Sequence, residues 1–487
     1  MNAARLAPQI INNSLILFLG KIASVGIGVV ATMVLVRHIS VSDFGRYAFT
    51  FSFISFFNVL LDFGVVMIAT REISRDLSSA STALGNLILF RLVWAIALMA
   101  AAAGVAVALG YPRDVQMLVF IASFTLLFSS FSILEVIFRV NLKMIYSVLA
   151  GTAGALIAGT SLIICVLFLK MSLTGLIIVN TVCAAVPAIL MLIFSKKFVK
   201  LKLRLNIPQL RNILMESFPQ GIATFLSALY FNADIILVSK LAGDASVAYY
   251  SSAYKILSMV VFIPSAVMTT VFPLLSRNSG EPEALKQIFQ KTFYYLQLIG
   301  IPVAALLMIY SRNVIVFLFS QKYIASVEAL NILAWAGAII FGSTLLGYAL
   351  VAINRQNLGI IIASLGLILN VALNLWWIPR YDFIGAAMAT VATESLIAFL
   401  LLFVVQRYSG MLPFSRRLIK APILGLLFSV FIIFLKNINL TLSLVAIIPL
   451  YAILLKTLRC YQDDFSVPEL IRSFLNPGEK KAVETHA

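Results

Sequence analysis

The sequence predicts an all-α integral membrane protein, because apolar residues dominate it and charged residues are scarce. Hydrophobic residues make up 62% of the 487 residues and charged residues 11%, whereas soluble domains have about 45–50% and about 25%. Apolar stretches of roughly 20 residues, enough to cross a bilayer as a helix, follow one another almost from end to end. Together these observations exclude a soluble globular protein with a separate catalytic domain.

Fourteen membrane helices are expected when each apolar run is bounded by charge, Gly or Pro. The first run follows Arg5 and is too long for the apolar part of a signal peptide, so we expect it to be a membrane helix. The expected helices cover residues 11–36, 46–69, 84–109, 115–138, 145–169, 173–194, 213–239, 247–276, 288–311, 325–352, 357–378, 384–406, 417–435 and 440–458.

The basic residues indicate the orientation of these helices. An even number of helices places both termini on one side, and about two thirds of the 36 Lys and Arg lie on that side, which the positive-inside rule makes cytoplasmic. The densest basic segment, residues 196–205, joins the sixth and seventh helices, and its alternation is typical of a strand or of a ribbon on the membrane. We interpret it as an anchor to anionic lipid, with a regulatory or partner-binding role as the alternative. The net charge of +17 therefore indicates lipid headgroups and no nucleic acid.

The two halves of the chain have similar residues at corresponding positions, which suggests an internal duplication. The segment from Arg37 to Arg75 matches the segment from Ser239 to Arg277 at a constant offset of 202 residues. Each half has six helices, so the repeats are parallel, an arrangement typical of transporters that bind substrate between two lobes. We expect an N-lobe at 1–195, a basic connection at 196–212, a C-lobe at 213–410, two terminal helices at 411–460 and a cytoplasmic tail at 461–487.

Several short segments carry recognisable motifs. They are Asp43-Phe44-Gly45-Arg46-Tyr47, Leu61-Asp62-Phe63-Gly64 with Thr70-Arg71-Glu72, Ser217-Phe218-Pro219, and Asn370-x3-Asn374-x3-Ile378-Pro379 followed by Gly385-Ala386-Ala387-x-Ala389-Thr390. Over roughly residues 10–410 the chain resembles the polysaccharide exporters, that is, the Wzx-like flippases of the multidrug/oligosaccharidyl-lipid/polysaccharide (MOP) superfamily, with a MATE-like fold. Asp382 departs from the family pattern, which has a small residue such as Gly at this place.

The resemblance implies a flippase of the cytoplasmic (inner) membrane. Such a protein turns an undecaprenyl-pyrophosphate-linked oligosaccharide repeat unit to the outer face for O-antigen, capsule or exopolysaccharide assembly, by alternating access. It is not an enzyme and needs no cofactor. Its implied partners are the lipid-linked glycan, membrane lipids and the polysaccharide polymerase machinery. The last two helices resemble a peripheral pair found in part of the superfamily.

Two pairs of ionisable residues fall at matching depths in neighbouring helices. Asp62 and Arg91 lie toward the cytoplasmic side, and Asp234 and Lys255 lie toward the outer side. Charges within membrane spans are costly and indicate function unless they neutralise each other. We expect each pair to be a structural ion pair within its lobe, with a direct role toward substrate or protons as the alternative.

Lys21 is the best candidate for a cation that binds substrate. It lies near the middle of the first helix, and no acid occurs at the same depth in the neighbouring helices. Ser24, Gly28 and Thr32 follow on the same helix face, so Lys21 belongs to a polar stripe. We expect Lys21 and Ser24 to face a cavity and to bind the pyrophosphate of the substrate; an ion pair with an acid that the sequence does not reveal is the alternative.

Other polar residues have weaker assignments. Arg46 at the outer end of the second helix is a candidate second phosphate contact. Tyr249, Tyr250 and Tyr254 flank Lys255, and an interfacial aromatic belt or stacking on sugars would explain them. Glu394 has no obvious partner; it is either a proton-coupling carboxylate or hydrogen-bonded to Ser and Thr of neighbouring helices.

Two other functions are weighed against the flippase. A cation-coupled drug exporter of the same superfamily favours acidic residues in its cavity, whereas Lys21 and Lys255 favour an anionic ligand. A membrane glycosyltransferase or polysaccharide polymerase needs a sizeable outer loop with catalytic acids, and every expected outer connection is short. Two His and three Cys with no acidic cluster beside them predict no metal site. No phosphate-binding loop motif occurs, so we expect coupling to an ion gradient or to consumption of the product.

Overall fold

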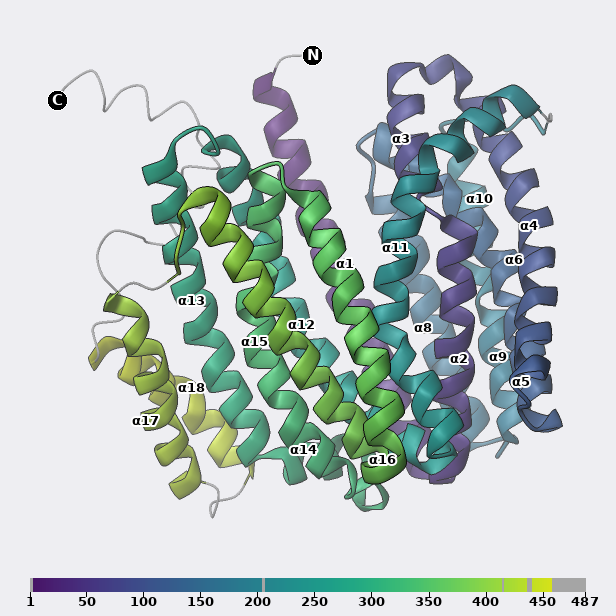
Figure 1. The fold of residues 1–487 in the computed structure, drawn as a ribbon. Coiled ribbons are helices and arrows are strands. Elements are labelled where there is room, and N and C mark those ends of the chain that lie inside the picture. Colours follow the sequence, from purple (N-terminus) through teal and green to yellow (C-terminus); the bar gives the residue numbers. More distant parts are fainter. Residues whose placement is uncertain (1–2, 204–205, 414–415, 436–439, 458–487) are drawn as a thin grey trace.

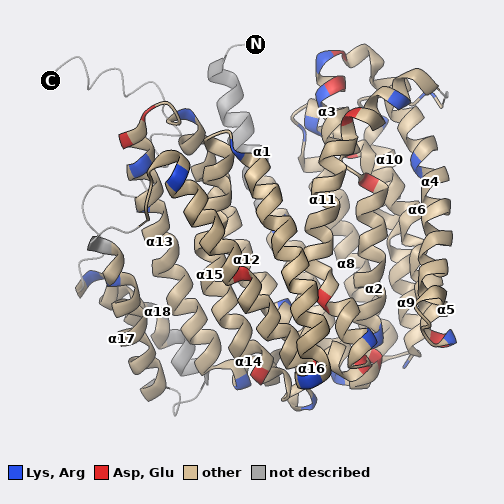
Figure 2. Cartoon of the chain, in the orientation of Figure 1, with Lys and Arg blue, Asp and Glu red and all other residues tan. Residues whose placement is uncertain are grey.

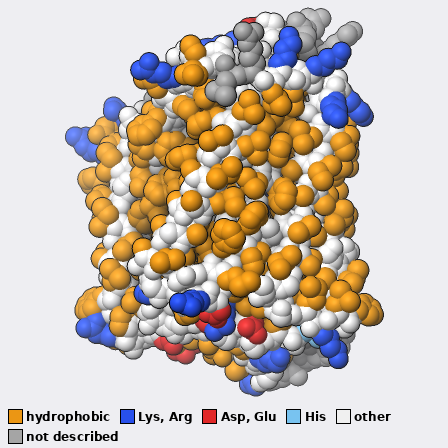
Figure 3. Space-filling model, turned by 90° about the vertical axis from the view of Figure 1, so that its right-hand side faces the viewer, with side chains coloured by type: hydrophobic (Ala, Val, Ile, Leu, Met, Phe, Trp, Pro, Cys, Tyr) orange, Lys and Arg blue, Asp and Glu red, His pale blue; other side chains and the backbone are white. Residues whose placement is uncertain are grey.

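The computed structural model describes residues 3–203, 206–413, 416–435 and 440–457, and every regular element in these ranges is a helix. The tail expected at 461–487 lies outside the described residues. Long helices run roughly side by side (Figure 1), and Lys, Arg, Asp and Glu gather at their two ends (Figure 2). Between these ends an apolar belt covers the face seen in Figure 3. The belt and the helix lengths fit a bilayer, and 11 helices of the described part are long and apolar enough to cross one.

The first half of the chain forms α1 to α10, several of them short pieces of one longer span. Between α2 and α3, Phe63 and Gly64 adopt left-handed conformations (φ 39° and 78°), which change the direction of the chain. The helices are α1 (Ala3–His38), α2 (Val41–Asp62), α3 (Val65–Arg75), η1 (Leu77–Ser79), α4 (Ala80–Ala108), α5 (Arg113–Ser123), α6 (Thr125–Ser129), η2 (Ser130–Leu134), α7 (Glu135–Val140), α8 (Ile145–Leu167), α9 (Leu173–Cys183) and α10 (Ala185–Ser195).

The second half forms α11 to α18; in Figure 1 α11 stands beside α2 of the first half, whereas α12, α13, α15, α17 and α18 stand on the left. α3 ends at Arg75 and α12 at Arg277, as the offset of 202 residues predicts; the duplication itself and the two-lobe division stay predictions. The helices are α11 (Ile207–Leu241), α12 (Asp244–Arg277), α13 (Pro282–Ile309), α14 (Ser311–Phe319), η3 (Gln321–Tyr323), α15 (Ser326–Ala352), α16 (Gln356–Ser409), η4 (Arg416–Ile419), α17 (Lys420–Leu435) and α18 (Leu440–Thr457).

The 54 residues of α16 form a hairpin of two helical arms. A straight helix of this length would reach about 80 Å, but Asp382 is non-helical, with φ 56° and ψ −147°. A Cβ atom added to Gly385 would lie 2.6 Å from the carbonyl carbon of Trp377, and one added to Gly366 would lie 2.5 Å from the Ile397 side chain. The arms are therefore antiparallel and closely packed.

The hairpin explains two expectations from the sequence. The positive φ of Asp382 favours glycine, which accounts for the small residue of the family pattern at this place. The helices expected at 357–378 and 384–406 correspond to the two arms, so α16 counts once among the 11 candidate spans. The count of fourteen spans stays a prediction.

The basic connection between α10 and α11 is docked on the N-terminal half. The amide of Lys202 donates to the carbonyl of Ser81 over 3.1 Å, and Asn86 of α4 donates to the carbonyl of Asn206 over 2.8 Å. A Cβ on Gly85 would lie 2.1 Å from the Lys202 carbonyl oxygen, so only glycine allows this approach. Among the described residues 196–203 there is no strand, so the strand alternative is wrong there, and the ribbon on the membrane stays a prediction.

Candidate functional site

The predicted pair of the N-terminal half, Asp62 and Arg91, is an ion pair. Nη1 of Arg91 on α4 lies 3.0 Å from Oδ1 of Asp62 at the end of α2. Arg91 is 1% exposed, and its Nη2 also donates to the Ser129 carbonyl over 3.3 Å and to Ser132 Oγ over 3.1 Å. The charge of Arg91 is thus neutralised inside the helix bundle, which favours the structural interpretation of this pair.

The predicted pair of the C-terminal half does not form. Asp234 on α11 is 4% exposed, and no ion pair to it is found in the described part of the chain. Instead, neutral groups donate to its carboxylate: the Tyr250 hydroxyl over 2.5 Å, the Asn374 amide over 2.7 Å and the Thr390 hydroxyl over 3.0 Å. The ion pair predicted from the matching depth of Asp234 and Lys255 is wrong, because the two side chains point to different neighbours.

The α16 hairpin builds the surroundings of Asp234. Its first arm supplies Asn374, whose amide also donates to Oδ1 of Asn370 over 3.0 Å, and its second arm supplies Thr390. The turn at Asp382 places these residues of the two arms at one level, since they lie eight residues to either side of it. Oδ1 of Asn374 is buried and has no hydrogen-bond partner among the described residues.

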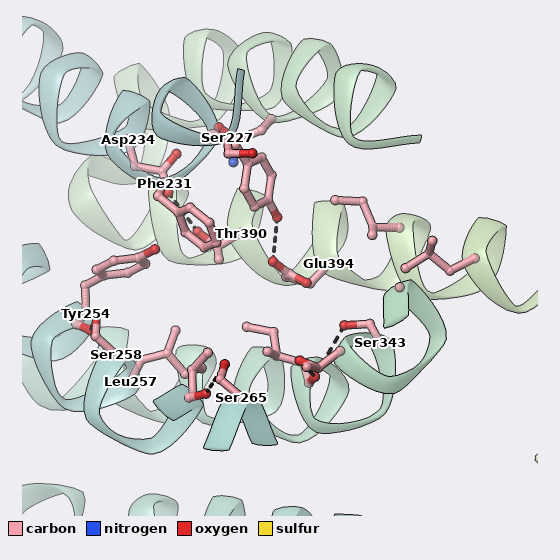
Figure 4. Close-up of a pocket in the computed structure, with 18 of the residues that line it drawn as sticks. Ser227, Phe231, Asp234, Tyr254, Leu257, Ser258, Ser265, Ser343, Thr390 and Glu394 are labelled. Carbon is pink, nitrogen blue, oxygen red and sulfur yellow. Dashed lines mark hydrogen bonds between the residues drawn. The ribbon is translucent and has the colours of Figure 1, made fainter. Parts of the chain in front are cut away.

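A cavity of about 880 Å³ opens beside this cluster, between α11, α12, α15 and α16. Figure 4 shows Asp234, Glu394, Tyr254 and several Ser side chains on its walls. Glu394 is 7% exposed, and its Oε1 accepts a hydrogen bond from the Tyr230 hydroxyl over 2.6 Å. We call this cavity the acidic chamber; its wall includes Ser227, Tyr230, Phe231, Asp234, Tyr254, Ser258, Ser265, Ser343, Tyr348, Asn370, Thr390 and Glu394.

The aromatic residues near the start of α12 are not arranged as an interfacial belt. Tyr250 is fully buried and bonded to Asp234, and the Tyr254 ring stacks on the Tyr250 ring with centroids 5.6 Å apart. Tyr249 packs on the rings of Phe383 and Tyr323. The belt interpretation is therefore wrong for Tyr250, and Tyr254 faces the acidic chamber.

Lys255 joins the polar stripe of α1 instead of Asp234. Its Nζ donates to Oγ1 of Thr32 over 2.5 Å, and Thr32 donates to the carbonyl of Gly28 over 2.7 Å. Lys21 is exposed and Ser24 half-buried on the same helix. Within the described residues, neither lysine has a carboxylate partner. The stripe predicted from the sequence thus runs from Lys21 to a second cation at Thr32.

Arg46 does not present a free charge. Its Nη1 lies 2.8 Å from Asp114 and its Nε 2.6 Å from Asp244 at the start of α12. Two carboxylates already compensate the guanidinium, so this geometry does not favour the phosphate contact that we expected of Arg46.

Comparisons with known proteins agree with this architecture. The model of the family described as "Polysaccharide biosynthesis protein" matches residues 34–328, more than half of the chain. The chain belongs to this polysaccharide biosynthesis protein family. The resemblance to Wzx-like flippases of the MOP superfamily is thereby confirmed.

Two individual relatives have low sequence identity to this chain, over part of its length. A protein of Haloferax volcanii named a probable low-salt glycan biosynthesis flippase is 22% identical over 159 residues, 32% of this chain and 34% of that protein. A teichuronic acid biosynthesis protein of Bacillus subtilis is 29% identical over 128 residues, 26% of either chain. The chain thus matches about a third or less of the length of these two relatives.

The fold is shared with a solved structure. The lipid II flippase MurJ in an inward closed conformation superposes with a TM-score of 0.75 at 16% identity, covering 91% of this chain and 98% of that one. At this identity the likeness concerns the fold alone. It supports an all-α membrane transporter fold for this polysaccharide biosynthesis protein.

The motifs around Gly45, Phe63, Arg71 and Phe218 lie where the two halves of the chain meet. A Cβ on Gly45 would lie 1.8 Å from the Asp244 carbonyl oxygen, so α2 and α12 touch closely there. Near the other end, the ring of Phe63 packs edge-on against Phe218 of α11 with centroids 5.8 Å apart. Arg71 of α3 forms an ion pair with Glu216 of α11.

The sequence interpretation missed the role of several polar residues of the C-terminal half. Asn370, Asn374 and Thr390 were recognised as parts of a motif but had no assigned role, and Tyr230 was not singled out at all. An available signal was the spacing of the two Asn residues, because i and i+4 place both amides on one face of an otherwise apolar span. Their meeting with Asp234 depends on the hairpin and could not be read from spacing.

Proposed function

We propose that this protein is a flippase for lipid-linked oligosaccharides that works by alternating access. Its substrate is an undecaprenyl-pyrophosphate-linked repeat unit of O-antigen, capsule or exopolysaccharide, moved from the cytoplasmic to the outer face of the membrane. The family assignment supports this proposal, as do a relative named as a glycan biosynthesis flippase and a fold shared with a lipid II flippase. Membrane lipids and a polysaccharide polymerase are its further partners.

The polar stripe of α1 is the observation that carries the proposal. Lys21 and the Lys255 contact at Thr32 lie 11 residues apart on this helix, roughly 16 Å at 1.5 Å per residue. Both cations lack a carboxylate partner among the described residues. Unpaired ammonium groups at membrane depth favour an anionic ligand, and lysine is a common phosphate ligand.

A pyrophosphate would make use of this arrangement during transport. It must exchange its hydration for protein cations before it leaves water. Thr32 satisfies Lys255 only with a neutral hydroxyl, so a phosphate oxygen is the stronger acceptor and replaces it. Lys21 and Lys255 then hold the headgroup from opposite sides, one on α1 and the other on α12.

Substitution of Lys21 tests the flippase directly. In a flippase-null strain, Lys21→Ala and Lys21→Glu should abolish surface glycan, normalised to the amount of protein in the membrane. Lys21→Arg should retain partial export, because the charge matters more than the number of donors for a point-like contact. Export by Lys21→Ala at the wild-type level would remove Lys21 from the substrate site.

We infer that transport is coupled to a cation gradient at Asp234. Its carboxylate, the unpartnered Oδ1 of Asn374 and the Thr390 hydroxyl are oxygen ligands of the kind that hard cations prefer. No group of three or more His, Cys, Asp or Glu occurs in the described part of the chain, so the ligand set does not suit a transition metal. The role of Glu394 as a proton carrier is the alternative coupling site.

We also propose that the protein lies in the cytoplasmic membrane with fourteen spans and both termini inside. The lobes would be residues 1–195 and 213–410, joined by the connection 196–212, with the helices of 411–460 at the periphery. A cytoplasm-active reporter fused at Lys200 should be active, and one fused at Lys322 should be silent. The reverse result at Lys200 would overturn this topology.

A further inference from the structure

We propose that the connection between the two halves is a strap, which fastens the start of α11 to the N-terminal half and is needed for export in its docked state. The strap consists of residues 196–203 and of residues 206–214, which include the first two turns of α11. The sequence alone predicts an anchor to anionic lipid through the lysines. The docking contacts use instead the apolar side chains between the lysines, and the backbone. The role in export rests on the flippase function proposed above, whereas the docking does not.

The side chains of the strap are sorted into an exposed and a covered side. Every lysine among residues 196–203 is exposed. Between them, Phe198 and Leu201 are half-buried, and Val199 is 9% exposed. In an extended chain, successive side chains point to opposite sides. Lysines interleaved with apolar residues therefore suit a chain that has one side covered by protein, and no sheet is needed to explain the pattern.

The covered side of the strap completes a hydrophobic core of the N-terminal half. Val199 and Ile213 are buried in a cluster whose other described buried members come from residues 65–191. The ring of Phe198 packs edge-on against the ring of Phe138, with centroids 5.8 Å apart. Removal of these apolar surfaces from water favours the docked state of the strap.

The backbone of the strap is fixed at the start of α4. The Ser81 hydroxyl donates to the carbonyl of Lys200, and the amide of Lys202 donates to the Ser81 carbonyl over 3.1 Å. The strap passes so close to Gly85 that an added Cβ atom would lie 2.1 Å from the Lys202 carbonyl oxygen. Both lysines thus take part in the docking through their backbone, so their side-chain charge is not what holds the strap.

The docked strap decides which half the start of α11 belongs to. Residues 207–214 contribute apolar side chains to the same core, and Glu216 forms an ion pair with Arg71 of α3. Beyond Pro219, which donates no backbone hydrogen bond, the apolar side chains of α11 pack in the core that both halves share. Alternating access moves the two halves relative to each other. The strap makes the start of the helix that carries Asp234 follow the N-terminal half, which a free tether would not do.

A pair of glycine variants on α4 tests the docking. Gly85→Ala pushes a Cβ atom into the strap, whereas the Cβ atom of Gly104→Ala meets no described neighbour within 4 Å. Hydrogen exchange would be measured on the full-length protein in phosphatidylcholine nanodiscs. The Lys202 amide should exchange slowly in the wild type and in Gly104→Ala, and at least tenfold faster in Gly85→Ala. Surface glycan per membrane protein, in a flippase-null strain, should fall at least tenfold in Gly85→Ala only.

Removal of charge separates a strap from a lipid anchor. Lys196, Lys200 and Lys202 would be changed together to Gln, while Lys197 stays because its Nζ lies 5.3 Å from the centre of the Tyr146 ring. We expect slow exchange and export close to that of the wild type. Loss of export by this triple variant would overturn the proposal in favour of a lipid anchor. Fast exchange of the wild type in the absence of anionic lipid would do the same.

A second pair of variants keeps the test informative if Gly85→Ala fails to fold. Val199 is 9% exposed, and Leu203 on the same strap is 65% exposed. Val199→Asn puts a polar group into the core and should speed exchange and lower export, while Leu203→Asn should change neither. Equal exchange by the two members of either pair would contradict the docking, and wild-type export by a variant whose strap exchanges rapidly would contradict its role.

The two readouts keep this proposal apart from the flippase function on which its second part rests. A wild-type protein that restores no surface glycan in the flippase-null strain would overturn the flippase function, and with it the role of the strap in export. The exchange rates of the glycine variants would still decide whether the strap is docked.

Discussion

Asp62 and Asp234 are carboxylates at membrane depth in the two halves of the chain, and they are held in opposite ways. Asp62 pairs with Arg91 over 3.0 Å. Asp234 accepts hydrogen bonds from a tyrosine, an asparagine and a threonine instead. The same reasoning from depth predicted an ion pair for each, and it was right for one of them only.

The different partners of Asp62 and Asp234 indicate different roles, in stability for Asp62 and in transport for Asp234. In the ion pair the charges of Asp62 and Arg91 compensate each other, so neither charge is available to a mobile ligand. Neutral donors orient a carboxylate without supplying a counter-charge, and Asp234 has no cationic side chain as partner within the described residues. We infer that the Asp62–Arg91 pair contributes to the stability of the N-terminal half, while the Asp234 carboxylate of the C-terminal half is available for coupling.

The largest effect is expected at Asp62. Asp62→Asn leaves Arg91 buried without a counter-charge and should destabilise the protein by about 3 kcal/mol. The double variant with Arg91→Gln should recover part of this loss, since no isolated charge remains. Unfolding of the purified variants in one detergent measures the coupling between them. Strictly additive losses would argue against the pair.

A smaller effect on stability and a larger one on export are expected at Asp234. Asp234→Asn keeps a hydrogen-bonding group of the same size and removes the charge, so its unfolding free energy should change by about 1 kcal/mol or less. Export, measured as surface glycan per protein, should fall at least tenfold because the cation has lost its ligand. Wild-type export by a folded Asp234→Asn protein would exclude coupling at this residue.

The smallest effect is expected at the turn that builds the Asp234 cluster. Asp382→Gly suits the positive φ and loses only the hydrogen bond that the Phe383 amide donates to Oδ1, so stability should change by less than about 1 kcal/mol. Asp382→Val has a branched side chain that this conformation disfavours, and should lower both stability and export. Equal behaviour of the two variants would mean that the turn does not control the cluster.

Composition and the spacing of apolar residues predicted the class of the protein, because burial in lipid needs long apolar helices whatever their arrangement. The motifs predicted the family, and the spacing of Lys21, Ser24, Gly28 and Thr32 predicted the stripe that Lys255 joins. Counting residues along the spans also predicted that Asp62 and Arg91 lie at the same depth in the membrane. These features depend on the rise and turn of single helices, which the sequence determines locally.

The partners of Asp234, Lys255, Arg46 and Glu394 were decided only by tertiary packing. A position along a helix says how deep a side chain lies, but the rotation and packing of that helix decide which neighbour it faces. Asn374 and Thr390 meet Asp234 because the chain reverses at Asp382. The acidic chamber likewise requires four helices from two separate segments of the second half, α11 with α12 and α15 with α16. Such contacts join residues distant in sequence, and no local periodicity encodes them.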